Sequence, residues 1–416
     1  MEKPASPYKV AVAQLGARMH YAVPRILHEA GMLHRFYTDI CAVKGWPRWL
    51  HMLPEELRVN GLKRLLSRVP DGVPRERIKA FANLGARYYW RRARAMSPTE
   101  TTSAHLWAGR AFGERVIAEG REKVDAVYTF NSAGLEILQY AGQNGIRGLV
   151  EQTIAPRRYE RKLLEEEHAR YPSWEPTARK DQRLPEFIER EHTEWECADT
   201  IVCGSPFVRD SVAACGGPVE KCTVVPYGVD ARFCVPESRP HDGPLRVLTV
   251  GSVGLRKGAP YVLETAKCCE GGAAFRMVGS VDVTEAARLQ LEKHVDVVGR
   301  VPRSAMPHQY EWADVFLLPS ICEGSATVTY EALAAGLPVI CTPNSGSIVR
   351  DEKEGFIVPI RDPEAIAECI HRLATDRQLR STMSKNALVR YEEAGNLDAY
   401  ADRLIKEISS PHGMLP

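Results

Sequence analysis

Short apolar runs recur along the chain, and each is followed by a segment of helical length. The runs at 126–130, 200–203, 245–250 and 315–318 are rich in the aliphatic and aromatic residues that favour buried strands. Strands that alternate with helices form parallel sheets. The pattern therefore predicts an α/β fold with two doubly wound, Rossmann-like sheets in sequence. Further strands are expected at 8–13, 36–38, 148–150, 223–226, 275–278, 296–298 and 338–341.

A change in composition near the middle of the chain separates the two predicted sheets. The stretch 236–244 is rich in proline and polar residues and directly precedes an apolar strand, which is typical of a linker. We therefore expect an N-terminal domain at 1–238 and a C-terminal domain at 239–395. Residues 396–416 are expected to form a helix that packs back on the N-terminal domain. Ligands bind beyond the carboxyl ends of strands in such sheets, so the two domains predict a central cleft.

Two carboxylates with seven residues between them, Glu323 and Glu331, stand at a predicted junction of strand and helix. Glu323 falls in the turn, and the free N–H groups of the helix start that follows it attract phosphate. Glu331 lies further into the helix, where it can accept hydrogen bonds from a diol such as a ribose. This arrangement suits a sugar nucleotide, and two solvated glutamates on an ordinary helix are the alternative explanation. The expected phosphate seat consists of Gly324, Ser325, Ala326 and Thr327.

A basic pair, Arg256 and Lys257, follows the strand at 245–250 and precedes a glycine. Cations that face a diphosphate stabilise the charge of a leaving group. We expect this pair to meet the diphosphate from the side opposite the Glu323 loop. A solvated turn is the alternative.

Several segments of the C-terminal half together resemble the donor site of family-4 retaining glycosyltransferases, which have the two-domain GT-B fold. The resemblance covers about residues 185–395 well and the N-terminal part weakly. It implies a glycosyltransferase of hexosyltransferase type that uses a nucleotide-diphosphate sugar as co-substrate, needs no cofactor or metal and retains the anomeric configuration. The absence of an Asp-x-Asp motif from the sequence agrees with this expectation. The matching segments are 225–230, 250–258, 319–320, Glu323 with Glu331, 336–340 and 354–358.

The resemblance also assigns roles to individual residues. It implies that Glu323 holds hydroxyls of the transferred sugar, that Glu331 holds the ribose, and that Lys257 and Arg256 offset the charge of the diphosphate. Ser252 stands where the family usually has an arginine, and we expect Arg256 to substitute for it. The predicted catalytic residues are Glu323, Lys257 and Arg256, and further donor-binding residues are Gly16, Ala17, Ser252, Gly299 and Arg300.

The N-terminal domain departs from the family at one position near the reacting sugar. Many members carry a histidine there, and this chain has Phe130 or Asn131. Three residues are candidate contacts to the acceptor or the sugar: His20, Asn131 and Glu151. This departure leaves open a second hypothesis for the function, that the chain is a catalytically weak nucleotide-sugar-binding protein of the same fold. The acceptor is expected to be a carbohydrate, a lipid-linked molecule or a small molecule.

The overall composition excludes some classes of partner. Lys and Arg total 55 against 53 Asp and Glu, so the net charge gives no reason to expect nucleic acid binding. The eleven cysteines include no Cys-x-x-Cys pair, which favours a reducing cytoplasm. We find no signal peptide and no apolar stretch of membrane-spanning length. The expected location is cytoplasmic, with peripheral contact to the inner face of the cytoplasmic membrane.

That peripheral contact is expected through residues 44–94. This stretch holds thirteen Lys and Arg against four acids, with tryptophans and tyrosines among them. Basic helices with aromatic residues can lie on an anionic bilayer. A solvated basic face over an apolar core is the alternative. A second charged segment, 157–190, is expected to be an exposed helix and loop without chemistry.

Overall fold

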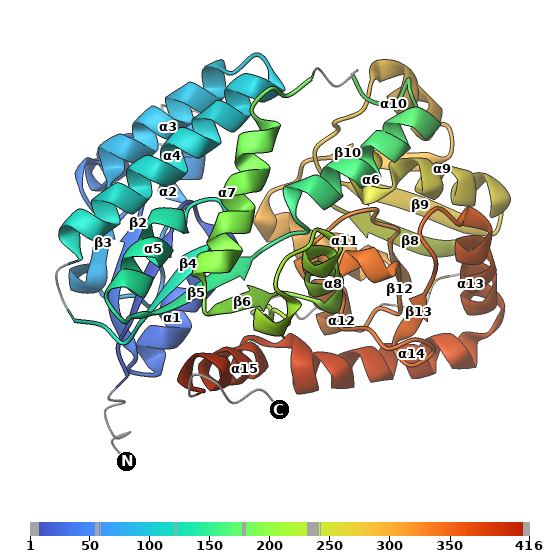
Figure 1. The fold of residues 1–416 in the computed structure, drawn as a ribbon. Coiled ribbons are helices and arrows are strands. Elements are labelled where there is room, and N and C mark those ends of the chain that lie inside the picture. The colour runs from blue at the N-terminus through green and yellow to red at the C-terminus, as the bar shows by residue number, and fades with distance from the viewer. Residues whose placement is uncertain are drawn as a thin grey trace.

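A computed structural model describes residues 8–54, 58, 60–120, 123–176, 180–230, 241 and 243–410. Two α/β domains, each with its own parallel sheet, lie side by side (Figure 1). The helices cover both faces of each sheet, so strand residues are buried on both sides and read as continuous apolar runs. The predicted fold class, two Rossmann-like domains in the GT-B arrangement, is confirmed.

The N-terminal sheet has seven parallel strands in the order β3-β2-β1-β4-β5-β6-β7. Two of them coincide with the predicted runs 126–130 and 200–203. The strand at 78–80 was not predicted, because it is three residues long and lies inside the basic stretch. The strands are β1 (Val10–Gln14), β2 (Leu33–Thr38), β3 (Ile78–Ala80), β4 (Ala126–Phe130), β5 (Arg147–Gln152), β6 (Thr200–Cys203) and β7 (Cys222–Val224).

The helices of this half connect the strands and form its outer layers. The longest of them is α4. Ser97 caps its start by accepting a hydrogen bond from the backbone N–H of Glu100, and Pro98 is its first residue. The helical segments are η1 (Arg18–Tyr21), α1 (Ala22–Glu29), η2 (Trp46–Met52), α2 (Asn60–Leu66), η4 (Arg75–Arg77), α3 (Ala82–Arg94), α4 (Pro98–Glu119), α5 (Leu135–Gln143), α6 (Arg157–Arg170), α7 (Leu184–Cys197), α8 (Pro206–Ala214) and η5 (Val219–Lys221).

The C-terminal sheet has six parallel strands in the order β10-β9-β8-β11-β12-β13. They are β8 (Leu245–Val250), β9 (Ala273–Val278), β10 (Val295–Gly299), β11 (Val315–Leu318), β12 (Val339–Cys341) and β13 (Gly355–Ile357). The helical segments are η7 (Leu255–Lys257), α9 (Ala259–Cys268), α10 (Glu285–Leu291), η8 (Arg303–Ala305), α11 (Met306–Trp312), α12 (Thr327–Ala334), η9 (Pro343–Ser345), α13 (Pro363–Thr375), α14 (Arg377–Arg390), η10 (Tyr391–Gly395) and α15 (Leu397–Ser409).

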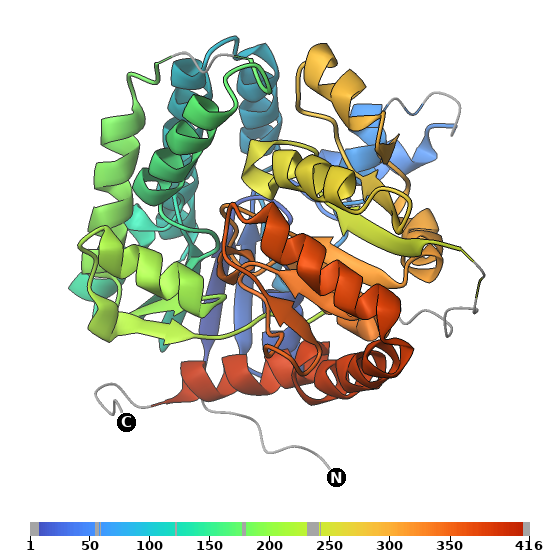
Figure 2. The same cartoon turned by 90° about the vertical axis from the view of Figure 1, so that its right-hand side faces the viewer.

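The last helix, α15, lies along the N-terminal domain (Figures 1 and 2). The guanidinium of Arg147 donates a hydrogen bond to the carbonyl of Ile408 at 2.8 Å, and Tyr400 packs edge-to-face on Tyr227. Most of the predicted linker 236–244, and with it the predicted domain boundary at 238, lies outside the described residues.

The prediction for the charged segment 157–190 was wrong. Its helix α6 lies over the C-terminal domain (Figure 1), and Leu163 is part of that domain's apolar core. Glu167 is fully buried and accepts hydrogen bonds from Tyr261 and Arg361 of the C-terminal domain. Charge density suggested solvent exposure, but the buried acids here have partners on an element distant in sequence. The segment joins the two domains.

Two further observations concern the cysteines and the helices of the described residues. Every cysteine in the described ranges is an unpaired thiol. Over the same ranges, each helix is too short or too polar to cross a membrane.

Candidate donor site between the domains

Two loops of the C-terminal domain, those after β8 and after β11, are packed tightly on one another. The backbone N–H of Ile321 donates to the carbonyl of Arg256 at 2.9 Å. Gly258 has a φ of +75°, and a Cβ there would lie 2.2 Å from the carbonyl oxygen of Pro319. Only glycine satisfies both demands. This close approach places the basic pair directly against the Glu323 turn.

Glu323 is held by both cations of that pair. Its Oε1 lies 2.7 Å from Nη1 of Arg256 and 2.8 Å from Nζ of Lys257. Arg256 also donates to the carbonyl of Cys322 at 3.1 Å. Glu323 and Lys257 are both nearly buried, so neither charge is tolerable without a partner. The three side chains form one ionic cluster.

The structure corrects the expected position of the cations. We expected Arg256 and Lys257 opposite the Glu323 loop, and they lie against it instead. Burial lowers the pKa of the Lys257 ammonium, and the neighbouring Glu323 carboxylate partly opposes this effect. The physical reason for the arrangement is the carboxylate, which offsets the cost of burying the Lys257 ammonium, while the half-buried Arg256 pairs with the same oxygen.

The helix α12 starts beside this cluster. It begins at Thr327 rather than at the predicted Gly324, and no side chain caps it. The first amide N–H groups of an α-helix have no acceptor within the helix, so they can meet an anion. Two bonds fix the approach to the helix: Ala326 N–H donates to the carbonyl of Ser345 at 3.1 Å, and Ser325 bonds the Tyr330 hydroxyl at 2.7 Å.

The turn at Gly324 touches the N-terminal domain. A Cβ on Gly324 would lie 1.9 Å from the carbonyl oxygen of Thr153, in the loop after β5. Ser205, in the loop after β6, donates to the Gly324 carbonyl at 2.5 Å. The carboxyl ends of strands from both sheets therefore meet at this turn, which is where ligands bind in open α/β folds.

Glu331 lies on α12 with one oxygen engaged. Its Oε2 accepts a hydrogen bond from the hydroxyl of Tyr310 at 2.7 Å. Burial raises the pKa of the Glu331 carboxyl, while the Tyr310 bond and the nearby charge of Arg303 lower it. Within the described parts of the chain Oε1 has no bonding partner, so one oxygen stays available for a hydroxyl of a ligand.

The remaining donor residues predicted in this domain lie at strand ends of the same sheet. Gly299 ends β10 with a φ of +78°, and its carbonyl accepts from Gly279 N–H at 2.9 Å. Arg300, the next residue, is exposed, and Ser252 is half-buried in the loop after β8. These positions are compatible with the predicted roles and do not by themselves test them.

In the N-terminal domain the loop after β1 faces Arg303 of the C-terminal domain. Gly16 has a φ of +90°, its N–H donates to Asp39 at 3.0 Å, and Ala17 follows at the start of η1. His20 has a left-handed backbone, and its Nε2 lies 2.6 Å from Nη1 of Arg303. Partial burial and the Arg303 charge lower the pKa of His20, which keeps the ring neutral and able to accept this bond.

Asn131 belongs to a chain of hydrogen bonds that leads towards the same loop. Its Oδ1 accepts from the hydroxyl of Thr153 at 2.9 Å, and Thr153 in turn accepts from the guanidinium of Arg18. Phe130, the neighbour of Asn131, is buried beneath Arg18, 6.0 Å from its guanidinium. Asn131 rather than Phe130 therefore presents polar chemistry at the usual histidine position.

Glu151 does not lie where a substrate would reach it. Its side chain is 1% exposed, and both carboxylate oxygens are engaged, one by Tyr128 at 2.7 Å and the other by Tyr227 at 2.6 Å. Burial raises the pKa of this carboxyl. The geometry favours a structural role in joining β4, β5 and the segment that leaves the domain.

Sequence reasoning missed several residues that shape this site. Tyr310 orients Glu331, Arg303 meets His20, and Thr153 links the N-terminal loops to each other and to Gly324. Arg303 could have been identified from the sequence as a candidate, because it closely follows the predicted strand at 296–298. Tyr310 and Thr153 could not be identified in this way, since their roles depend on packing between elements distant in sequence.

Residues 235–390 match the family model described as "Glycosyl transferases group 1". The amylovoran biosynthesis glycosyltransferase AmsK of Erwinia amylovora is 30% identical over 40% of this chain and 45% of its own length. An Escherichia coli relative is 25% identical over 44% of this chain and 53% of its own. It is named UDP-Gal:alpha-D-GlcNAc-diphosphoundecaprenol alpha-1,3-galactosyltransferase. The chain spans about half the length of the curated relatives it matches.

Among solved structures, Anabaena Alr3699/HepE in complex with UDP and glucose resembles this chain along nearly its whole length. Its TM-score is 0.63 and its sequence identity 14%, and the alignment covers 97% of this chain and all of that one. At this identity the likeness supports the fold alone. The chain therefore has the two-domain GT-B fold, and its residues 235–390 are similar to the family described as glycosyl transferases group 1.

Proposed function

We propose that the protein is a glycosyltransferase that moves a sugar from a nucleotide-diphosphate sugar to an acceptor, with retention of configuration and without a metal ion. One observation carries the proposal: Arg256 and Lys257 converge on Glu323 within one turn of the uncapped start of α12. A buried ammonium and a half-buried guanidinium beside the start of a helix are suited to a diphosphate, and Glu331 on the same helix keeps one oxygen for a ribose.

In the proposed reaction the bond from the anomeric carbon to the diphosphate breaks, and the acceptor oxygen bonds that carbon on the same face. The proton of the acceptor hydroxyl passes to a phosphate oxygen of the departing nucleoside diphosphate, so charge and atoms balance. Lys257, Arg256 and the N–H groups of α12 stabilise the negative charge of the leaving group. Glu323, fixed by the two cations, accepts hydrogen bonds from the sugar and orients it.

The acceptor is proposed to be a glycan or a lipid-linked sugar bound on the side of the N-terminal domain. Support comes from the names of relatives, one in amylovoran biosynthesis and another acting on a diphosphoundecaprenol-linked sugar. A lipid-linked acceptor would place the enzyme at the inner face of the cytoplasmic membrane. Peripheral contact through residues 44–94 belongs to this proposal.

Release of nucleoside diphosphate from a panel of UDP-, GDP- and ADP-sugars tests the function. We expect slow hydrolysis of one donor without acceptor, and loss of that activity in Lys257→Ala. Binding of a nucleotide sugar without any release, even with glycan and lipid-linked acceptors present, would instead support the second candidate, a binding protein that does not turn over. The replacement of the usual histidine by Phe130 and Asn131 is the feature that favours that candidate.

A further inference from the structure

One face of the N-terminal domain exposes large aromatic side chains beside arginines. Trp49 on η2 is 58% exposed, and Trp90 on α3 is 54% exposed. Each has a guanidinium over its ring, from Arg48 at 4.5 Å and from Arg94 at 4.2 Å. Large exposed aromatic side chains that gather on one face are typical of a surface that binds a partner or a membrane.

The two elements that carry these side chains are neighbours. The indole N–H of Trp46 on η2 donates to the side chain of Asn83 on α3 at 3.2 Å. On α3 itself Arg87, Trp90, Arg91 and Arg94 are spaced i, i+3, i+4 and i+7, which places them on a single face of the helix. The exposed residues Trp46, Arg48, Trp49, Arg87, Trp90, Arg91 and Arg94 are called here the tryptophan–arginine face.

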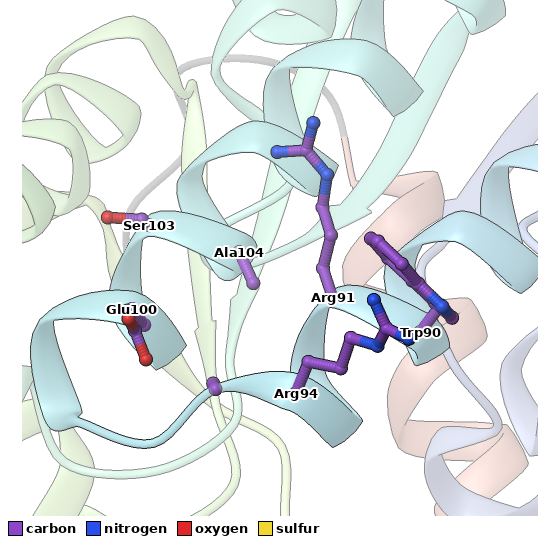
Figure 3. A pocket seen from close by; sticks show the side chains of 7 residues that line it. Trp90, Arg91, Arg94, Glu100, Ser103 and Ala104 are labelled. Atoms are coloured by element: carbon purple, nitrogen blue, oxygen red, sulfur yellow. The ribbon is translucent and has the colours of Figure 1, made fainter.

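This face is hollowed. A depression of about 340 Å³ lies between α3 and α4, with Arg91, Arg94 and Trp90 on one side and Glu100 and Ser103 on the other (Figure 3). A second depression, also of about 340 Å³, lies along α3 and shares Trp90 and Arg91 with the first. Arg91 lies 4.1 Å above the ring of Trp107 on α4, so its guanidinium is held in place. Glu100 is engaged by the backbone N–H of Met96 at 2.6 Å.

We propose that the hollows on α3 bind the phosphate headgroups of anionic membrane lipids, with Trp90 and the η2 tryptophans inserted at the level of the headgroups. Planar guanidinium groups bind phosphate through paired hydrogen bonds. Tryptophan concentrates at the interface of a bilayer because its ring is apolar and its N–H is polar. The face therefore matches a lipid surface in both charge and polarity.

Charge complementarity selects this occupant. Residues 44–94 carry thirteen Lys and Arg against four acids in a chain whose net charge is only +2, so the positive charge is concentrated in this region. A bilayer with anionic lipids attracts such a patch, at about fivefold in partitioning per cation close to the surface. The pairing of Trp49 with Arg48 and of Trp90 with Arg94 suits an interface that is apolar below and charged above.

The inference rests on the proposed function in one respect, since it explains how a lipid-linked acceptor would reach the enzyme. It adds the location and the ligand: a face on α3 and η2, and a lipid phosphate. Vesicle binding and donor hydrolysis are separate measurements, so the two proposals can fail independently.

The test is co-sedimentation of the full chain with vesicles of phosphatidylcholine alone and of phosphatidylcholine with phosphatidylglycerol. We expect binding only to the anionic vesicles, weakened by salt as the Debye length shortens. The variant Arg91→Glu/Arg94→Glu should lower partitioning at least about 25-fold, about fivefold for each of the two cations lost. Its matched control, Arg110→Glu/Arg115→Glu, makes the same charge change further along the neighbouring helix α4, at residues outside the hollows, and should bind almost as the wild type does.

The aromatic part is tested in the same way. Trp90→Ala should lower partitioning severalfold, whereas Leu289→Ala, at an equally exposed apolar residue of the C-terminal domain, should not change it. Folding of each variant is checked by thermal melting and by donor hydrolysis without vesicles. Equal binding to neutral vesicles, or equal binding by Arg91→Glu/Arg94→Glu and its control, overturns the proposal. So would a concentration-dependent dimer that this variant abolishes, because a second copy would then cover the face.

Discussion

Both domains contain carboxylates with little exposure to solvent, but the surroundings of these groups differ. In the C-terminal domain Glu323 is bound by two side-chain cations, and Glu331 keeps one oxygen without a partner in the described chain. In the N-terminal domain Glu151 gives both oxygens to tyrosine hydroxyls. Glu194 likewise accepts from the backbone N–H groups of Ser132, Gly134 and Leu135 at the start of α5.

The difference is also electrostatic. Burial raises the pKa of Glu151, and it raises that of Glu194 to about 7, since these carboxyls lie deep in the domain. Burial lowers the pKa of Lys257 beside Glu323, and the Glu323 carboxylate opposes this shift, so the ionic contact favours the charged ammonium. The comparison teaches that a buried or half-buried carboxylate is a candidate site residue only where its partners leave room for a ligand.

The largest expected effect is that of Lys257→Ala on turnover. The ammonium group is expected to stabilise the departing diphosphate, and removal of such a group costs about 100-fold or more in kcat. Initial rates of nucleoside diphosphate release at saturating donor give the value. The control is Lys267→Ala, at an exposed lysine on α9, and it should leave kcat unchanged. A kcat within about twofold of wild type in Lys257→Ala would remove the cluster from catalysis.

The next effect concerns Glu331 and the tyrosine that orients it. Glu331→Ala should raise the donor KM about tenfold or more, since the loss of a hydrogen bond to a charged group costs about 1.5–3 kcal/mol. Tyr310→Phe removes only the orienting hydroxyl and should raise KM less. Titration of donor concentration for both variants separates these effects. A fall in kcat with an unchanged KM would place Glu331 away from the ribose.

In contrast to the Glu331 variants, substitution of Glu151 should change stability and not the donor KM. Glu151→Leu leaves the buried hydroxyls of Tyr128 and Tyr227 without their acceptor, which should lower the free energy of unfolding by about 2–4 kcal/mol. The donor KM of the folded fraction should not change. Urea unfolding followed by circular dichroism measures the first quantity. An unchanged stability together with a raised acceptor KM would return Glu151 to the candidate acceptor contacts.

The smallest effect is a pH dependence from the N-terminal domain. Burial and the nearby charges of Arg92, Arg157 and Arg18 lower the pKa of His105 to about 4, from an ordinary value near 6.5. Between these two values the unfolded chain binds a proton that the folded chain does not, so stability falls as pH falls. His105→Gln should remove about 2 kcal/mol of the loss between pH 7 and 4.5. Unfolding curves of the wild type and of His105→Gln at the two pH values measure the loss of stability in each protein. Equal losses in the two proteins would contradict the prediction.

Much of the fold could be predicted because parallel strands buried on both faces leave uninterrupted apolar runs. The runs at 126–130, 200–203, 245–250 and 315–318 match β4, β6, β8 and β11 residue for residue. The strands β3 and β13 were missed because each is only three residues long. The helix α6 was wrongly placed in solvent, because charge along the chain does not reveal which acids and bases find partners far away in sequence.

The residues of the candidate site could be predicted from the sequence, but their contacts could not. Glu323, Arg256 and Lys257 could be singled out from their motifs, but not their direct pairing, which depends on Gly258 allowing two loops to touch. The sequence predicted a ribose contact for Glu331 and an acceptor or sugar contact for Glu151, but it could not show which carboxylate keeps an oxygen for a ligand. Only the tertiary partners, Tyr310 on one side and two tyrosines on the other, distinguish an available carboxylate from a fully bonded one.

The most direct test of the central claim is a crystal structure with the nucleoside diphosphate of the preferred donor. We predict the diphosphate at the first turn of α12, within hydrogen-bonding distance of Lys257 or Arg256, and the ribose hydroxyls on Glu331. A diphosphate bound elsewhere, with the Glu323 cluster and Glu331 contacting no part of the nucleotide, would contradict the account.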